Sequence, residues 1–226
     1  MNKTIVITGA NRGIGFAMAK ICQQRGDIVY ALCRHSSAQL DDLGVNIIEN
    51  IDIATELGIA RAKSILSNIK IDLLINNAGI LRDESLRHFN QDTILEQFTV
   101  NALAPMVFTQ ALLTNLNVGS KVAFITSRMG SVTDNSSGGR YGYRMSKAAL
   151  NIAAMSLAKD LAQDQIAVGI YHPGYVQTDM VNVLGSISNG DISAEVSAQR
   201  LIALMDNLTM NDSGVFKHSN GEELPW

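Results

Sequence analysis

Cysteine, proline and charge are all scarce in this sequence, and each shortage excludes a class of protein. The 226 residues include only Cys22 and Cys33, which give no disulfide framework and no metal-ligand spacing. Three prolines leave no proline-rich linker. No apolar run approaches the roughly 18 residues that a membrane-spanning helix needs. We therefore expect a reducing, cytoplasmic setting with no metal and no membrane.

Basic residues are too few for a dedicated nucleic-acid binder, so no nucleic-acid partner is expected. Lys and Arg total 18 against 21 Asp and Glu, a net charge of −3, whereas such binders carry a basic stripe. The apolar run 5–7 is too short for a secretory signal peptide, because Thr8 and Gly9 follow it at once. Hydrophobic residues make up 46% of the chain, which is ample for a core, and the length suits a single domain over 1–226.

Short apolar runs alternate with longer helical patterns along the chain. Parallel strands linked by helices give this alternation, and strands buried on both faces read as continuous apolar runs. The sequence therefore predicts one doubly wound, Rossmann-type α/β domain with a mostly parallel sheet and helices on both faces. The expected strands are 4–6, 28–33, 46–48, 73–75, 121–125 and 167–171, and the expected helices are 14–25, 57–67, 94–116, 143–163 and 193–208.

A glycine-rich turn joins the first expected strand to the first expected helix. Gly9, Gly13 and Gly15 are spaced G-x-x-x-G-x-G, which is neither the G-x-G-x-x-G fingerprint nor a P-loop. Glycine lets backbone amides approach a pyrophosphate at a helix N-terminus. An ordinary strand-to-helix turn is the alternative, but the context favours a dinucleotide site.

Two arginines stand where a dinucleotide site would hold the adenine ribose. NAD-binding folds place a carboxylate near the end of the second strand, but here Cys33 is followed by Arg34, and Arg12 lies inside the glycine turn. A guanidinium binds phosphate in a bidentate geometry and keeps its charge. Either arginine alone could be an ordinary surface residue, whereas the two together predict NADP(H).

Tyr143 and Lys147 lie four residues apart on an expected helix, so they share one face. A nearby ammonium lowers the phenol pKa from its usual value of about 10, and the pair can then act as a general acid–base. On most helices a tyrosine and a lysine four residues apart are simply surface residues. Tyr141 lies six residues before Lys147 and therefore faces a different side of the helix. Ser127 follows the expected strand 121–125. Because ligands bind at the carboxyl ends of parallel strands, Ser127 favours a site beside Tyr143.

The combination of motifs resembles the short-chain dehydrogenase/reductase family from Thr4 to about Met180. Residues 8–15 have the form Thr-Gly-x-x-x-Gly-x-Gly, 76–79 read Asn-Asn-Ala-Gly and 100–102 read Val-Asn-Ala. The resemblance implies a catalytic tetrad of Asn101, Ser127, Tyr143 and Lys147. The cofactor contacts that it implies are Gly9, Asn11, Arg12, Gly13, Ile14, Gly15, Arg34, Asp52, Ile53, Asn77, Ala78, Gly79, Tyr143, Lys147, Pro173, Gly174, Val176 and Thr178.

Within the family, fewer residues indicate a narrower branch. Ser131 and the segments 138–139, 143–151 and 221–226 look like the branch that holds sniffer-type carbonyl reductases and C-factor-like proteins. The segment from 179 to about 193 sets the substrate in this family. Here it is short, apolar and contains two glycines, which suggests a mobile lid over an apolar pocket.

The resemblance implies a role for each member of the tetrad. Tyr143 would donate a proton to a carbonyl oxygen while NADPH delivers hydride, and Lys147 would bind the nicotinamide ribose. Ser127 would position the carbonyl, and Asn101 would hold a water that relays protons. The implied function is oxidoreduction of a small ketone, aldehyde or quinone. The alternative is an NADP(H)-sensing regulatory or intercellular-signalling protein with little turnover, and the intact tetrad favours catalysis.

The expected helix 143–163 is apolar around most of its circumference, which predicts self-association. A helix packed on a sheet needs only one apolar stripe, so its outer face should also be buried. Members of the family commonly pair this helix and the one before it with their twofold mates. We expect a homodimer or homotetramer, with Ala154 a candidate for the outer face. Intrachain loops could instead cover that face, and alanine also serves simply as a good helix former.

Overall fold

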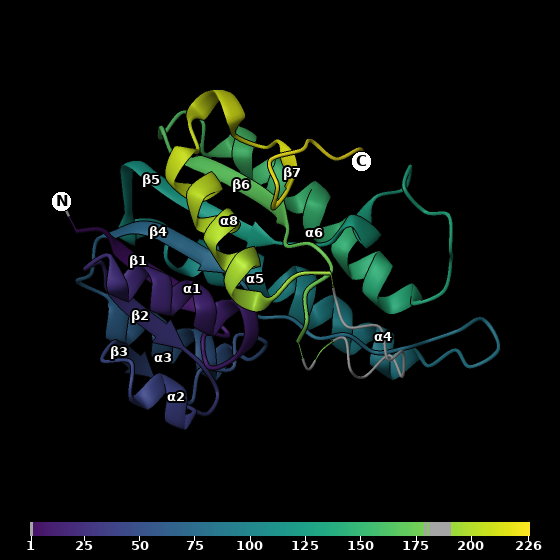
Figure 1. Ribbon diagram of the computed structural model, residues 1–226, viewed down its shortest axis with the longest axis horizontal. Coiled ribbons are helices and arrows are strands. Elements are labelled where there is room, and N and C mark those ends of the chain that lie inside the picture. The colour runs from purple at the N-terminus through teal and green to yellow at the C-terminus, as the bar shows by residue number, and fades with distance from the viewer. Residues whose placement is uncertain (1, 179, 181–190) are drawn as a thin grey trace.

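Seven parallel strands form one sheet in the computed structural model, which describes residues 2–178, 180 and 191–226 (Figure 1). The strand order is β3-β2-β1-β4-β5-β6-β7, and every neighbouring pair is parallel. The order reverses between β1 and β4, and such a reversal opens a crevice for ligands. The strands are β1 (Thr4–Thr8), β2 (Ile28–Leu32), β3 (Asn46–Ile48), β4 (Ile71–Asn76), β5 (Leu116–Ile125), β6 (Ala167–His172) and β7 (Phe216–His218).

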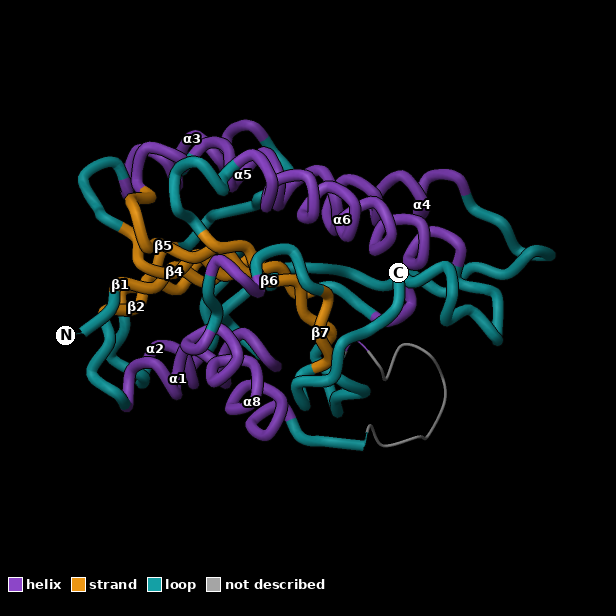
Figure 2. Tube along the Cα trace, turned by 90° about the horizontal axis from the view of Figure 1, so that it is seen from above, coloured by secondary structure: helices purple, strands orange, loops and turns teal. Residues whose placement is uncertain are grey.

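Helices cover both faces of the sheet, which confirms the doubly wound architecture. Figure 2 shows α1, α2 and α8 on one face and α3, α4, α5 and α6 on the other. Among the described residues, no helix is long and apolar enough to cross a membrane. The helices are α1 (Gly13–Gln24), α2 (Ala38–Asp41), α3 (Glu56–Leu66), α4 (Gln91–Phe98), α5 (Ala104–Ala111), α6 (Tyr141–Asp160) and α8 (Ala194–Asn207).

Each face of the sheet buries its own apolar cluster. Successive side chains of a strand point to opposite faces. Val6 and Phe124 therefore pack with Phe108 of α5, while Ile7 packs on the opposite side with Met18 of α1. All of these side chains are fully buried. The continuous apolar runs of the sequence arise because both faces of the strands are covered.

The segment expected as one helix over 94–116 is interrupted, so that prediction was only partly right. After α4 the chain forms a π-helix, Thr99–Leu103, before α5 begins. A 3₁₀ turn, Leu113–Asn115, then leads into β5, which starts at Leu116. The amide of Ala104 donates to the carbonyl of Thr99, five residues back. The extra residue of such a wide turn displaces the apolar pattern by only one position, and the pattern alone did not indicate the interruption.

Two short elements, α2 and β7, were missing from the prediction. One turn of helix depends on a local cap, here Ser37, whose hydroxyl accepts the amide of Leu40 at 3.2 Å. The three residues of β7 are too few to show a pattern. The tail then folds back beside β7, where the amide of Leu224 donates to the carbonyl of Phe216 at 2.8 Å. The tail thus hydrogen-bonds to part of the free edge of β7, the last strand of the sheet.

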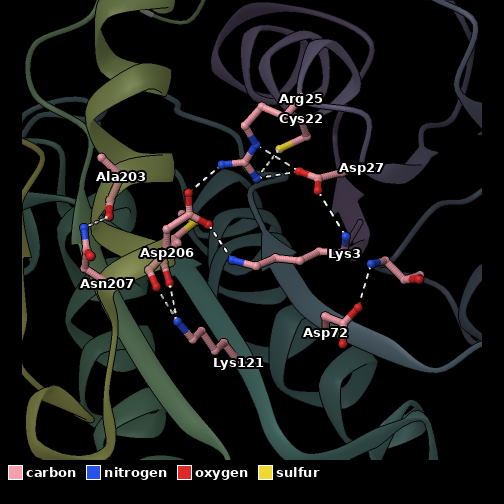
Figure 3. A network of polar contacts seen from close by, with 11 residues as sticks. Lys3, Cys22, Arg25, Asp27, Asp72, Lys121, Ala203, Asp206 and Asn207 are labelled. Carbon is pink, nitrogen blue, oxygen red and sulfur yellow. Dashed lines mark hydrogen bonds and ion pairs between the residues drawn. The ribbon is translucent and has the colours of Figure 1, made fainter. Parts of the chain in front are cut away.

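A network of charged side chains ties α1, β1 and α8 together at the edge where the first two strands begin (Figure 3). Lys3 donates to Asp206 at 2.8 Å, and Arg25 binds both Asp206 and Asp27. Lys121 donates to two carbonyl oxygens in the last turn of α8, at 3.0 and 2.7 Å. A cation at that position also complements the negative end of the helix dipole. Asp206 is thus the carboxylate that joins α8 to the first βα unit.

Replacing Asp206 with asparagine is expected to lower the free energy of unfolding at pH 7 by about 1 kcal/mol, because pairs this exposed contribute little. Burial acts to raise the pKa of Asp206, but the hydrogen bond with Lys3 and the charge of Arg25 outweigh it and hold the pKa below its ordinary value. The stabilisation is therefore complete at neutral pH and is lost as the pH falls below about 4. Urea unfolding at pH 7 and pH 3 measures this difference.

The matched control for this variant is Asp164→Asn, which changes an exposed carboxylate outside the network and beyond the end of α6. It should leave stability unchanged at both pH values. A loss for Asp206→Asn that is equally large at pH 3 would contradict the electrostatic explanation.

Candidate active site

A cavity of about 780 Å³ lies at the carboxyl ends of β1, β4, β5 and β6. It runs from Arg12 and Arg34 at one end to Tyr143 and Lys147 at the other. The structure thus brings together the two groups of residues that the sequence singled out separately. The predicted contacts that line it are Gly9, Asn11, Arg12, Gly13, Ile14, Gly15, Arg34, Asp52, Ile53, Asn77, Ala78, Gly79, Tyr143, Lys147, Pro173 and Thr178.

The glycine turn forms a cradle that a larger residue would fill. A Cβ atom on Gly15 would lie 2.3 Å from the carbonyl oxygen of Gly9, and Gly9 itself has a φ of +65°. The side-chain amide of Asn77 donates to the carbonyls of Thr8 and Gly9 at 3.0 and 3.1 Å. The hydroxyl of Thr8 in turn accepts the amides of Asn77 and Ala78. The turn is therefore held open, with its backbone available to an anion at the start of α1.

Tyr143 and Lys147 line the opposite end of the cavity, and Ser127, which is not among the lining residues, lies beside Tyr143. Tyr143 and Lys147 lie one turn apart in α6, and both are buried. Ser127 follows β5 and shares a hydrogen bond with the Tyr143 hydroxyl. The ammonium of Lys147 donates to the carbonyl oxygen of Ile125 at 3.0 Å and lies 5.7 Å from the centre of the Tyr143 ring. Tyr141 instead packs its ring against Phe89, as expected for a residue that faces away.

Burial dominates the protonation of this pair. It raises the pKa of Tyr143 to about 12, and the hydrogen bond with Ser127 offsets only part of that shift. It also lowers the pKa of Lys147 to about 8. The expectation that Lys147 brings the pKa of Tyr143 below its ordinary value was wrong for this structure, because the cost of burying a phenolate is larger than the attraction. Tyr143 therefore keeps its proton at neutral pH.

Asn101 lies in the π-helix, directly behind Gly79 and Lys147. Its side-chain oxygen accepts the amide of Ile80 at 2.8 Å. Its amide nitrogen donates to the carbonyl of Ile80 and to the hydroxyl of Ser146. Both N–H groups are thus used within the protein, so this nitrogen has no donor left for the water predicted from the sequence. Asn101 ties the π-helix to the segment that follows Gly79 and to α6.

Two predicted cofactor contacts are not among the residues that line this cavity. Gly174 has a φ of +93°, and a Cβ there would meet Ile192 at 3.0 Å. Val176 is buried and forms a parallel bridge with Ile192. Both residues pack against Ile192 and so help to hold the loop that follows β6. Of the expected lid, Met180 lines the cavity, while 179 and 181–190 lie outside the described residues.

Several residues that line the cavity escaped the sequence reasoning. Ile80, Arg82 and Glu96 belong to the stretch between the Asn-Ala-Gly motif and Asn101. Arg82 and Glu96 form an ion pair at 2.8 Å between partly exposed side chains. The sequence carries no signal for them, because only the π-helix and the loop before α4 bring them to the cavity.

Comparisons with known proteins agree with this geometry. The family model described as short chain dehydrogenase matches residues 3–187. The chain is 34% identical over 225 residues to 1-hydroxy-2-glutathionyl-2-methyl-3-butene dehydrogenase of Rhodococcus sp. (strain AD45), covering 99% of each protein. It is 40% identical over 159 residues to the C-signal of Myxococcus xanthus, covering 69% of this chain and 93% of that protein.

Solved structures of similar fold include carbonyl reductases. The NADPH-bound carbonyl reductase from chicken fatty liver superposes with a TM-score of 0.89 at 27% identity, covering 100% of this chain and 99% of that one. The carbonyl reductase Sniffer of D. melanogaster superposes with a TM-score of 0.87 at 26% identity, covering 100% of both chains.

Proposed function

Because this chain belongs to the short chain dehydrogenase family and is an oxidoreductase, we propose that it reduces small carbonyl compounds with NADPH. The sniffer and C-factor-like branch inferred from the motifs is confirmed by its relatives. The observation that carries the proposal is the cavity that joins a pair of arginines to a buried, protonated tyrosine. One end suits the phosphates of a dinucleotide, and the other end suits a carbonyl oxygen.

The cavity fits NADP(H) in its shape and in its charges. The glycine turn is closely packed, because a Cβ at Gly15 would overlap the carbonyl oxygen of Gly9, and its residues line the cavity at the start of α1, where a pyrophosphate would bind. Arg12 and Arg34 both line the adenine end and would bind a 2′-phosphate there. Asp52 and Ile53 border the same end and would contact the adenine. When bound, the cofactor supplies the hydride.

Tyr143 acts as the proton donor in the proposed reduction. Because burial holds its pKa at about 12, the phenol is fully protonated near neutral pH. It gives the proton to the carbonyl oxygen as negative charge develops there. The hydroxyl of Ser127 lies beside the phenol and stabilises the same oxygen, an effect that grows as the charge grows.

Lys147 supplies positive charge behind the phenol. Its pKa of about 8 leaves most of the ammonium charged at pH 7, and this charge favours the phenolate that remains after proton transfer. The contact with the carbonyl of Ile125 fixes the ammonium on the floor of the cavity. Deprotonation above about pH 8 removes this support, so proton return to Tyr143 becomes harder in alkaline solution.

A signalling protein that senses NADP(H) is the second candidate function. The similarity to the C-signal of Myxococcus xanthus favours it. However, a sensor needs the cofactor end of the cavity alone. The hydrogen-bonded pair of Tyr143 and Ser127 at the far end is an arrangement that only turnover would use.

Turnover of a carbonyl panel tests the proposal directly. NADPH oxidation is followed with ketones, aldehydes and quinones, and NADP⁺ reduction is followed with alcohols, including alcohols of glutathione conjugates. Activity with any class supports a reductase or dehydrogenase. Tight NADPH binding with no turnover on the panel would favour the sensor. A cytoplasmic location stays a prediction from the sequence.

We also propose that the chain forms a dimer through α4, α5 and α6. These helices carry exposed apolar side chains, and a large exposed apolar surface marks an interaction site. Ala154, the sequence-based candidate for this surface, is fully buried in the core, so that placement was wrong. The outward positions of these helices and of the π-helix between them carry the apolar surface instead. Its exposed residues are Leu95, Phe98, Leu103, Val107, Met145 and Ile152.

Replacing Ile152 with glutamate is expected to split the dimer, because a charge would be buried in the proposed interface. Ile152 is 65% exposed in the single chain, so the variant should fold normally. Light scattering at micromolar concentration measures the mass, which should fall to the 24.4 kDa of one chain. Leu57→Glu on α3 is the control for an exposed apolar residue elsewhere. A wild-type mass of 24.4 kDa would refute the dimer.

A further inference from the structure

The helix that carries Tyr143 begins without a cap of its own. Its N-cap residue is Arg140, which has a φ of +49° and makes no side-chain capping bond. Gly138 and Gly139 before it also have positive φ. Tyr143 is the third residue of α6 and therefore lies in the first turn, where helices fray unless the free amides are bound. Catalysis by Tyr143 thus depends on something else that holds this turn.

Glu84 supplies the missing cap from a loop almost sixty residues earlier in the chain. Its carboxylate accepts the amide of Gly142 at 3.3 Å, and its backbone carbonyl accepts the amide of Arg140 at 2.8 Å. A carboxylate at this position binds a free amide and also complements the positive end of the helix dipole. Although it is an acidic residue, Glu84 is only 3% exposed.

Two side chains of α4 hold Glu84 in place. Thr93 donates its hydroxyl to the Glu84 carboxylate at 2.7 Å, and Gln97 donates its side-chain amide at 2.5 Å. The side-chain oxygen of Gln97 accepts the backbone amide of Arg82 at 2.8 Å. Every contact to the carboxylate comes from a donor, which suits a group that only accepts.

The same contacts leave no space beside the first turn. A Cβ on Gly142 would lie 2.4 Å from the side-chain nitrogen of Gln97 and 3.1 Å from the Glu84 carboxylate. The helix therefore packs against this buried pair with its backbone. A small displacement of Glu84 or Gln97 would therefore move Gly142, the residue next to Tyr143.

We propose that Glu84 is a positioning residue for Tyr143: it caps α6 from the loop after β4 and fixes the place of the phenol in the cavity. The proposal rests on the proposed role of Tyr143 as proton donor. Glu84 does not line the cavity, so it acts through α6 and not on the cofactor or substrate.

The variant Glu84→Gln tests this role. Glutamine has the same size as glutamate, but one of the two carboxylate oxygens becomes an NH2 group. This NH2 group would face the donors of Thr93 and Gln97 or of Gly142, so the cap on α6 is weakened. The value of kcat should fall on the order of tenfold, as expected for loss of a cap, with little change in the NADPH dissociation constant. Hydrogen exchange at the Gly142 amide should accelerate by a similar factor, while the Ala154 amide in the middle of α6 stays protected.

A second variant separates positioning from general damage. In the double variant Glu84→Gln/Gln97→Glu the donor and the acceptor change places. The amide introduced at position 84 can donate to the carboxylate introduced at position 97 and still accept from Gly142. The double variant should recover most of the lost kcat and of the Gly142 protection, although the carbonyl of Thr93 loses the donor that Gln97 provides and the hydroxyl of Thr93 must donate to the carbonyl of Asn90 in place of Glu84.

The matched control is Glu56→Gln, which changes an exposed acidic residue in the first turn of α3. Glu56 is not among the residues that line the cavity, and it belongs to α3, not to α4 or α6. This variant should behave as wild type in both kcat and exchange at Gly142.

Two outcomes would overturn the proposal. One is a Glu84→Gln variant with unchanged kcat and unchanged exchange at Gly142. The other is a loss of kcat without faster exchange at Gly142 and without recovery in the double variant. If the wild-type protein turned over no carbonyl compound, the proposed function would fail, whereas the Gly142 exchange rates would still decide whether Glu84 caps α6.

Discussion

Replacing Tyr143 with phenylalanine is expected to lower the rate of carbonyl reduction by about 10²–10⁴-fold, the usual loss when a general acid is removed. Only the hydroxyl is lost, so the ring still fills its buried position in the first turn of α6. The cofactor end of the cavity lies at Arg12 and Arg34, away from the phenol, and NADPH affinity should stay near that of wild type. Steady-state rates and a separate fluorescence titration with NADPH measure the two quantities.

The control for this variant is two residues away on the same helix. Tyr141→Phe removes the hydroxyl of a side chain whose ring packs against Phe89, outside the cavity. It should keep the wild-type rate. A Tyr143→Phe variant that turns over a good substrate as fast as wild type would show that the proton comes from another group.

Exchanging Arg34 for aspartate is expected to weaken NADPH binding by about 100-fold or more and to change NADH binding little. The guanidinium would be lost as a charge-assisted partner, and a carboxylate would stand beside the 2′-phosphate in its place. NADH has no phosphate at that position, so it meets neither effect. Titration of both nucleotides by fluorescence gives the ratio of the two dissociation constants.

Arg200→Asp provides the same change of charge on the exposed surface of α8. It should leave both dissociation constants unaltered, which separates a local contact from a general effect of net charge. Equal weakening of NADPH and NADH by Arg34→Asp, or a wild-type preference for NADH, would remove the basis for the assignment of NADP(H).

Local patterns in the sequence were sufficient for the parts of the site that follow directly from strand ends. The glycine turn and Ser127 each come just after a buried strand, and parallel strands bring their carboxyl ends to one edge. The spacing of Tyr143 and Lys147 is a property of one helix turn. The resemblance added the Asn-Ala-Gly segment and Asn101, which no periodicity would have selected.

Long-range contacts account for what the sequence did not show. Glu84 and Gln97 look like ordinary polar residues of a loop and a surface helix, and their burial appears only when α4 packs against α6. The pKa of Tyr143 likewise depends on how deeply the phenol is buried, which the spacing of Tyr143 and Lys147 does not reveal. The placement of Ala154 failed for a similar reason, since its small side chain fits either face of the helix.

The π-helical turn Thr99–Leu103 contains one residue more than an α-helical turn would, and this extra residue sets how α4 is rotated relative to α5. Deleting a single residue there would restore regular helical spacing between α4 and α5, but Pro105 near the start of α5 has no amide to donate, so the joined helix would be kinked at that point. The deletion would also rotate α4 by about 100° relative to α5. Gln97 would leave Glu84, and Asn101 would leave Ile80. Shortening the chain by one residue at this turn is therefore expected to take apart the support of the active site.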